Sequence, residues 1–168
     1  MSSTEQGQPP SEAAVDREIV VSRVIDARRE GVYEAFTDVR HLSRWWGPEG
    51  FTTTTRQFEF RVGGVWAFTM RGPDGTEYPE WITWTGLTPP ERIEFLHGEH
   101  RDDPNAFESA FTFTDHGSGT RIELRTVFPS RRARDEAVEK YHAIEGARQT
   151  LSKLVAYVGE LDTVGEGR

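Results

Sequence analysis

The sequence predicts an α+β domain in which one antiparallel sheet of about seven strands wraps around a long C-terminal helix. Apolar residues recur three and four positions apart between Val138 and Leu161, which is the stripe of one amphipathic helix. Between Glu18 and Phe128, short stretches alternate apolar and polar residues and are separated by turn residues, which is typical of antiparallel strands. Because such a sheet must bury its apolar face, the helix is expected to lie across it.

The N-terminal part of the domain predicts one strand followed by two short helices. Glu18–Asp26 is rich in β-branched residues and alternates, which favours a strand. Arg29–Phe36 has the apolar spacing of a short helix. Asp38 can cap a second short helix that runs to Trp46, and Gly47-Pro48 ends it.

The middle of the chain predicts six further strands before the long helix begins near Arg131. Short hairpin connections make these strands antiparallel neighbours, so the first strand must join an edge or close the sheet. The expected strands are Thr52–Phe60, the stretch carrying Trp66, Phe68 and Met70, Glu77–Leu87, Arg92–His97, Phe107–Phe113 and Arg121–Phe128.

Composition narrows the possible functions. The absence of cysteine excludes disulfides, thiol catalysis and cysteine-based metal sites. The sequence contains neither a dinucleotide-binding fingerprint nor a phosphate-binding loop, so we expect no cofactor. The net charge of -8 argues against nucleic acid as a partner. No apolar run is long enough to span a membrane and no signal peptide is present, so we expect a cytoplasmic protein. We expect one domain over residues 17–162, a disordered leader over 1–16 and a disordered tail over 163–168.

Several short strings of residues also resemble a known family. They are Arg44-Trp45-Trp46-Gly47-Pro48, Arg61–Trp66 and Met70–Pro79, followed by Pro89–Ile93, Gly119-Thr120-Arg121 and Glu145–Leu154. In this order they resemble the START-like (SRPBCC, helix-grip) superfamily, and within it the bacterial branch named for the activator of the heat-shock-protein-90 ATPase. The resemblance covers Glu18 to Leu161 and implies a helix-grip fold.

The resemblance also bears on function. Ala147 stands where related sequences often carry tryptophan, and His97 where a larger aromatic is common, so both imply a modified cavity. The family name implies a chaperone as a possible partner. Fold precedent implies either binding of a small molecule between sheet and helix or an enzyme of the cyclase, dehydratase or hydrolase type.

Residues on one face of the predicted strands and on the helix stripe are the candidates for a ligand cavity. A partly polar, mostly aromatic lining suits a small apolar or aromatic molecule, although the same side chains could fill a dry core. The candidates are Trp66, Phe68, Met70, Glu80, Ile82, Trp84, Ile93, Phe95, His97, Ser109, Phe111, Phe113, Tyr141, Ile144 and Leu151.

Three other patterns have functional interpretations. Glu80 and His97 could serve as general acid and base if their strands are neighbours, although the primary expectation assigns no catalytic residue. His97-Gly98-Glu99-His100 matches no strong metal signature, so we predict a polar loop and no metal site. We expect Trp45-Trp46 to pack on the core, with an exposed patch for a homodimer or another protein as the alternative.

Overall fold

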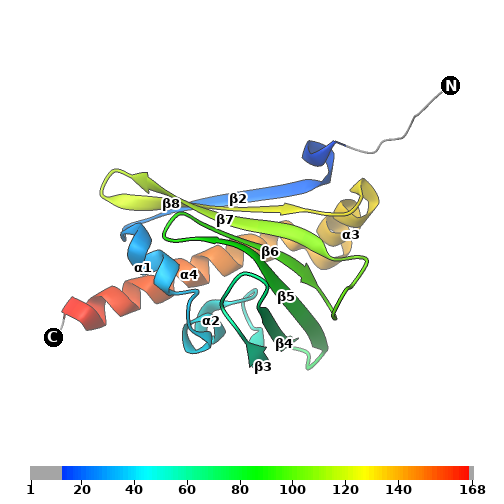
Figure 1. The fold of residues 1–168 in the computed structure, drawn as a ribbon, viewed down its shortest axis with the longest axis horizontal. Coiled ribbons are helices and arrows are strands. Elements are labelled where there is room, and N and C mark those ends of the chain that lie inside the picture. Colours follow the sequence, from blue (N-terminus) through cyan, green and yellow to red (C-terminus); the bar gives the residue numbers. More distant parts are fainter. Residues whose placement is uncertain (1–12, 167–168) are drawn as a thin grey trace.

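The computed structural model describes residues 13–166, with the side chains of residues 13–161. The order of elements along the chain is a short 3-10 helix, one strand, two short helices, six strands and two C-terminal helices (Figure 1). Their bounds are η1 Ala14–Arg17, β2 Glu18–Ile25, α1 Arg29–Glu34, α2 Val39–Trp45, β3 Thr52–Phe58, β4 Val65–Arg71, β5 Glu77–Thr88, β6 Arg92–Gly98, β7 Phe107–His116, β8 Gly119–Val127, α3 Arg131–Tyr141 and α4 Ala143–Glu166.

The strands form one antiparallel sheet of seven strands in the order β2-β8-β7-β6-β5-β4-β3. The consecutive strands β3 to β8 are neighbours, as short hairpins require. Strand β2 joins the edge beside β8, with Val21 opposite Leu124. The predicted α+β helix-grip architecture is therefore confirmed.

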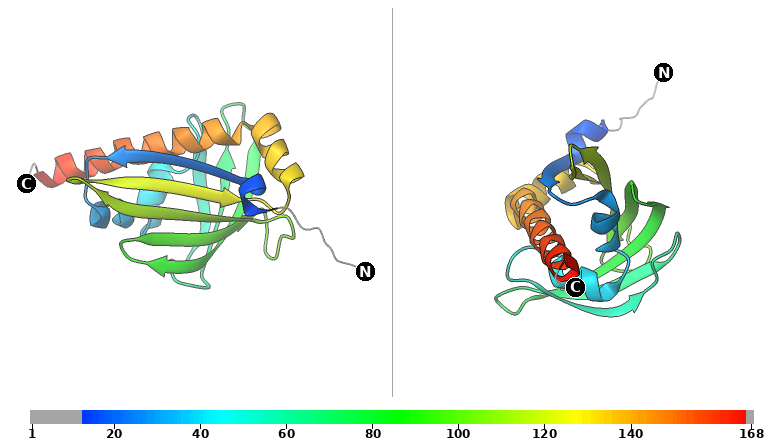
Figure 2. Two further views of the ribbon diagram at one scale, coloured as in Figure 1. Left: turned by 90° about the horizontal axis from the view of Figure 1, so that it is seen from above. Right: turned by 90° about the vertical axis from the view of Figure 1, so that its left-hand side faces the viewer.

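The sheet is curved, and the helices occupy its concave side (Figure 2). Helix α4 runs along this side next to β2, and the view along its axis shows the sheet bending around it (Figure 2). Helices α1 and α2 follow β2 and fill part of the same concave side (Figures 1 and 2). The concave face therefore meets different helices at its two ends.

Aromatic rings fill most of the space between the sheet and the short helices. Phe36, which follows the C-cap of α1, contacts Trp45 and Phe111 edge-on, with ring centroids 4.9 and 4.8 Å apart. Trp66 stacks on Phe68 along β4 with centroids 3.8 Å apart. These rings are almost completely removed from water, so this end of the interior is a packed core.

The long C-terminal helix differs from the prediction in one respect, since it is broken at His142. This residue has φ 54°, in the left-handed region, and its N–H donates to the carbonyl of Ala137 as a helix cap. The apolar stripe continues across the break, which is why spacing alone does not reveal it. Within residues 13–166, none of the helices is both long and apolar enough to cross a membrane.

The ends of the predicted domain fall partly outside the described residues. Residues 14–17, at the end of the predicted leader, form the 3-10 helix η1, and α4 extends to Glu166 within the predicted tail. Residues 1–12 and 167–168 lie outside the described part of the chain.

Gly119 is a position where the fold leaves no room for a side chain. A Cβ atom there would lie 2.3 Å from the carbonyl oxygen of Ile25, at the end of the β2–β8 pair. We expect G119A to lower the free energy of unfolding by about 2 kcal/mol or more, because backbone must move to relieve the overlap. Urea unfolding followed by circular dichroism measures the change.

The matched control is Gly31, which lies in α1, where a Cβ atom would meet nothing within 4 Å. We expect G31A to raise the free energy of unfolding by about 0.5–1 kcal/mol, since alanine loses less backbone entropy than glycine on folding. Equal effects of the two substitutions would contradict the steric argument.

Asp38 caps α2, as predicted, because its carboxylate accepts a hydrogen bond from the Arg40 N–H at 2.8 Å. The Arg40 side chain bonds the same carboxylate and, with this N–H, lowers the pKa of Asp38 from 3.8 to about 2. Because its pKa is lower in the folded protein, ionised Asp38 stabilises the fold above pH 3.8, and this contribution is lost as the pH falls toward 2.

We expect D38N to make the free energy of unfolding decline less steeply between pH 3.8 and about 2, measured by urea unfolding at each pH. The effect is small because the pair is exposed, and parallel curves would contradict it.

Candidate functional site

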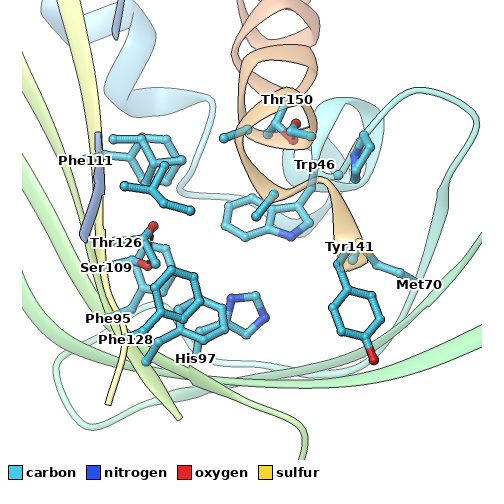
Figure 3. A pocket seen from close by; sticks show the side chains of 18 residues that line it. Trp46, Met70, Phe95, His97, Ser109, Phe111, Thr126, Phe128, Tyr141 and Thr150 are labelled. Atoms are coloured by element: carbon cyan, nitrogen blue, oxygen red, sulfur yellow. Dashed lines mark hydrogen bonds between the residues drawn. The ribbon is translucent and has the colours of Figure 1, made fainter. Parts of the chain in front are cut away.

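A pocket of about 230 Å³ lies between the sheet and the C-terminal helices. It occupies the end of the concave face away from α1, where β6 and β8 end and β2 and β7 begin. Figure 3 shows its two sides: Phe95, His97 and Ser109 on the sheet, with Trp46 and Tyr141 facing them.

The lining is mostly apolar, with a few hydroxyls and one imidazole. Strands β2, β4, β6, β7, β8 and the residue after β8 contribute one set of side chains, and the α2–β3 loop, α3 and α4 contribute the other. The lining residues are Ile19, Met70, Phe95, His97, Phe107, Ser109, Phe111, Leu124, Thr126 and Phe128 in the first set, and Trp46, Gly47, Pro48, Tyr141, Ala143, Gly146, Ala147 and Thr150 in the second.

The structure divides the candidate cavity residues into two groups. Met70, Phe95, His97, Ser109, Phe111 and Tyr141 line the pocket. The others lie outside its lining, and most of them belong to the packed core because the short helices and neighbouring rings cover that part of the sheet. This second group consists of Trp66, Phe68, Ile82, Trp84, Ile93, Phe113 and Leu151, which are fully buried, Ile144, which is half-buried against the core, and Glu80.

Glu80 and His97 are in direct contact. Strands β5 and β6 are neighbours and Ile82 lies opposite His97, so Glu80 is the diagonal neighbour of His97 on the same face. The Nε2 atom of His97 lies 2.5 Å from Oε1 of Glu80, and both side chains are mostly buried. The imidazole of His97 lines the pocket, whereas Glu80 is not part of the lining.

The serine and threonine hydroxyl groups of the pocket have partners within the protein. Ser109 Oγ and Thr126 Oγ1 lie 3.3 Å apart, on neighbouring strands β7 and β8. Thr150 donates to the carbonyl of Gly146 one helical turn earlier, at 2.9 Å. Tyr141, at the end of α3, is 59% exposed and marks the side where the pocket meets solvent.

The α2–β3 loop is fastened to α4 beside the pocket. The Glu49 N–H donates to Oε1 of Gln149 at 3.1 Å, and Lys153 Nζ donates to the carbonyl of Pro48 at 3.3 Å. Partial burial lowers the pKa of Lys153, and the nearby Glu49 opposes this shift. Pro48 is thereby held as part of the pocket lining.

The His97-Gly98-Glu99-His100 segment does not bring its imidazoles together. His97 lies in the pocket, whereas the largely exposed His100 places Nδ1 2.9 Å from the Arg101 carbonyl. The Glu99 N–H donates to Asp103, which orders the loop as a polar turn. Within the described part of the chain, no group of three or more His, Asp or Glu side chains could hold a metal ion.

Trp45-Trp46 packs on the core, as expected. Trp45 is 0% exposed and its Nε1 donates to the carbonyl of Ala35 at 3.0 Å. Trp46 is 7% exposed, contacts Trp66 edge-on at 5.0 Å and forms part of the pocket lining. The pair is therefore not an exposed patch for a partner.

Some lining residues were absent from the candidate set. Strand alternation could have indicated four of them, because they lie on the inward face of β7, β8 and the residue after β8. They are Phe107, Leu124, Thr126 and Phe128. Nothing in local spacing signals the remainder, because loop and helix geometry bring them to the pocket. They are Ile19, Trp46, Gly47, Pro48, Ala143, Gly146 and Thr150, whereas the family resemblance indicates Ala147.

Comparison with known proteins places this geometry in a family context. Residues 26–159 match the family described as Activator of Hsp90 ATPase homolog 1-like protein. No curated protein matches the chain.

Solved bacterial structures share the fold. A solution structure from Arthrobacter aurescens is 26% identical, with a TM-score of 0.78, covering 89% of this chain and 90% of that one. A Chromobacterium violaceum protein is 25% identical, with a TM-score of 0.74, covering 84% and 96%. A Silicibacter pomeroyi protein described as AHSA1 is 26% identical, with a TM-score of 0.64, covering 84% and 97%.

Proposed function

The chain belongs to the Activator of Hsp90 ATPase homolog 1-like family, and we propose that it binds a small apolar or aromatic molecule in the pocket between the sheet and α4. The observation that carries this proposal is the pocket itself, an apolar space lined by aromatic rings with a single imidazole. Ligand sites are concave and mostly apolar, with a few polar groups that set orientation.

The volume sets the size of the ligand. An apolar cavity of about 150 Å³ can hold benzene, so about 230 Å³ suits a molecule with one or two fused rings. Burial of its apolar surface contributes about 25 cal/mol per Å². The cost of association opposes this contribution, so only part of it is measured as affinity.

The experiment is native mass spectrometry of the purified protein, followed by calorimetric titration with a library of lipids and aromatic compounds. We expect one-to-one binding of one- and two-ring aromatic compounds. If no member of the library binds, the proposal is rejected.

Acid–base catalysis on the bound molecule is a second candidate. The observation in its favour is the contact between Glu80 and His97, with the imidazole on the pocket wall. Such a pair can hold and move a proton next to a bound substrate. Mass spectrometry of each bound compound after prolonged incubation tests this candidate, and unchanged masses throughout would reject it.

We do not propose chaperone regulation for this chain, although the family description names an ATPase activator. The tryptophan pair that could have formed a docking patch is buried, with Trp45 in the core and Trp46 on the pocket. A homodimer through the edge strands β2 and β3 stays a prediction.

A further inference from the structure

Among the polar groups of the pocket lining, His97 has one ring nitrogen without a partner in the described part of the chain. Its Nε2 is engaged by Glu80 at 2.5 Å. Within residues 13–161, Nδ1 of His97 has no hydrogen-bond partner. It is also absent from the set of unpartnered polar atoms that are completely buried. Nδ1 is therefore accessible, and the His97 ring lies on the pocket wall (Figure 3).

The contact with Glu80 sets the chemistry of Nδ1. A carboxylate accepts hydrogen bonds and does not donate them, so the hydrogen between the two side chains belongs to Nε2. In a neutral imidazole the other nitrogen then carries a lone pair. The neutral imidazole therefore offers Nδ1 as an acceptor, because a partner on one ring nitrogen fixes the state of the other, whereas a protonated ring would donate from both nitrogens.

The surroundings of Nδ1 restrict what can approach it. The ring of Phe107 lies 4.7 Å from the His97 ring, centroid to centroid, and those of Phe95 and Trp46 lie 6.2 and 6.5 Å away. The Thr150 hydroxyl donates to the Gly146 carbonyl, the Ser109 and Thr126 hydroxyls contact each other, and Tyr141 is largely exposed. A ligand that binds the imidazole must present a flat apolar body to the rings and one hydrogen-bond donor to Nδ1.

We propose that the pocket selects aromatic ligands carrying a hydroxyl of the phenol type, which donates its hydrogen to His97 Nδ1, and that Glu80 is the positioning residue that keeps Nδ1 an acceptor. This inference rests on the proposed function and adds the ligand class to it. An ether or an unsubstituted hydrocarbon of the same shape fills the same space without making the bond.

The test compares three probes of one size by calorimetry: 2-naphthol, 2-methoxynaphthalene and naphthalene. We expect 2-naphthol to bind about tenfold tighter than either of the others, which is the effect of one hydrogen bond. If none of the three binds, the proposed function fails and this inference with it. If all three bind with equal affinity, the proposed function stands and the inference is overturned.

Two variants separate recognition from mere packing. E80Q keeps the shape of the pair but allows its amide to donate to Nε2, so the preference for 2-naphthol should fall severalfold while naphthalene binds as before. E80Q combined with H97F removes the acceptor without leaving a buried carboxylate unpaired, and the preference should vanish. Circular dichroism verifies folding of both. A preference that persists in the double variant would overturn the assignment to His97.

Discussion

Replacing Ala147 with tryptophan is expected to abolish ligand binding while the fold is retained. Ala147 lies on α4 and lines the pocket. An indole at this position would occupy the space of about 230 Å³ that the ligand needs. We expect the affinity for 2-naphthol to fall by at least about 100-fold, measured by calorimetric titration. Because the new side chain fills an existing cavity, the free energy of unfolding should rise by about 0.5–2 kcal/mol.

The neighbouring residue supplies the control. Arg148 is exposed on the same turn of α4 and does not line the pocket. R148W adds the same indole to the same helix, so it should leave the affinity unchanged. If A147W binds the ligand as well as the unaltered protein does, the ligand occupies another place and the proposed pocket is rejected.

Ala147 illustrates how much of the pocket could be predicted from the sequence. Small residues on an amphipathic stripe usually pack without a gap, so periodicity alone does not indicate a pocket below this one. The family resemblance did indicate it, because tryptophan is common there in related sequences. The structure places Ala147 on the pocket lining, where its small side chain leaves space.

The fold was predictable because each element has a local signal. Asp38 marks the start of α2, a run of threonines marks β3, and alternation marks the strands from β4 to β8. The break at His142 has no such signal, since a left-handed histidine leaves the apolar spacing intact. Glycine or asparagine would have been the usual sequence marks of a helix end.

The position of the pocket along the strands could not be predicted for a different reason. Alternation in β7 puts Phe107, Ser109, Phe111 and Phe113 on one face, but it does not say which of them lie under a helix. Phe113 meets Tyr33 of α1 at 6.1 Å and is fully buried, whereas Phe107 and Ser109 line the pocket. That difference depends on where the short helices sit across the sheet, which is a tertiary property.

Replacing Trp45 with alanine is expected to cause the largest loss of stability of the changes considered for this chain. The side chain is completely buried and contacts Phe36 and Phe111 edge-on, at 4.9 and 6.4 Å between centroids. Its removal creates a large cavity, which costs about 3–5 kcal/mol, and frees the Ala35 carbonyl that its Nε1 satisfies. Domains of this kind have about 5–15 kcal/mol of total stability, so W45A should lose a large share of it and unfold at a much lower urea concentration than the unaltered protein, as measured by urea titration and circular dichroism.

Two companion variants assign this loss to its causes. W45F keeps most of the aromatic packing and loses the hydrogen bond to Ala35, so it should cost about 1–3 kcal/mol. W81A removes a tryptophan from the outer face of β5, where Trp81 is half-buried beneath Arg101 at 5.4 Å, and should cost about 1 kcal/mol or less. Equal losses for W45A and W81A would mean that Trp45 is not part of the core that joins α2 to the sheet. The pocket depends on that junction, because Trp46 follows Trp45 directly and forms part of its lining.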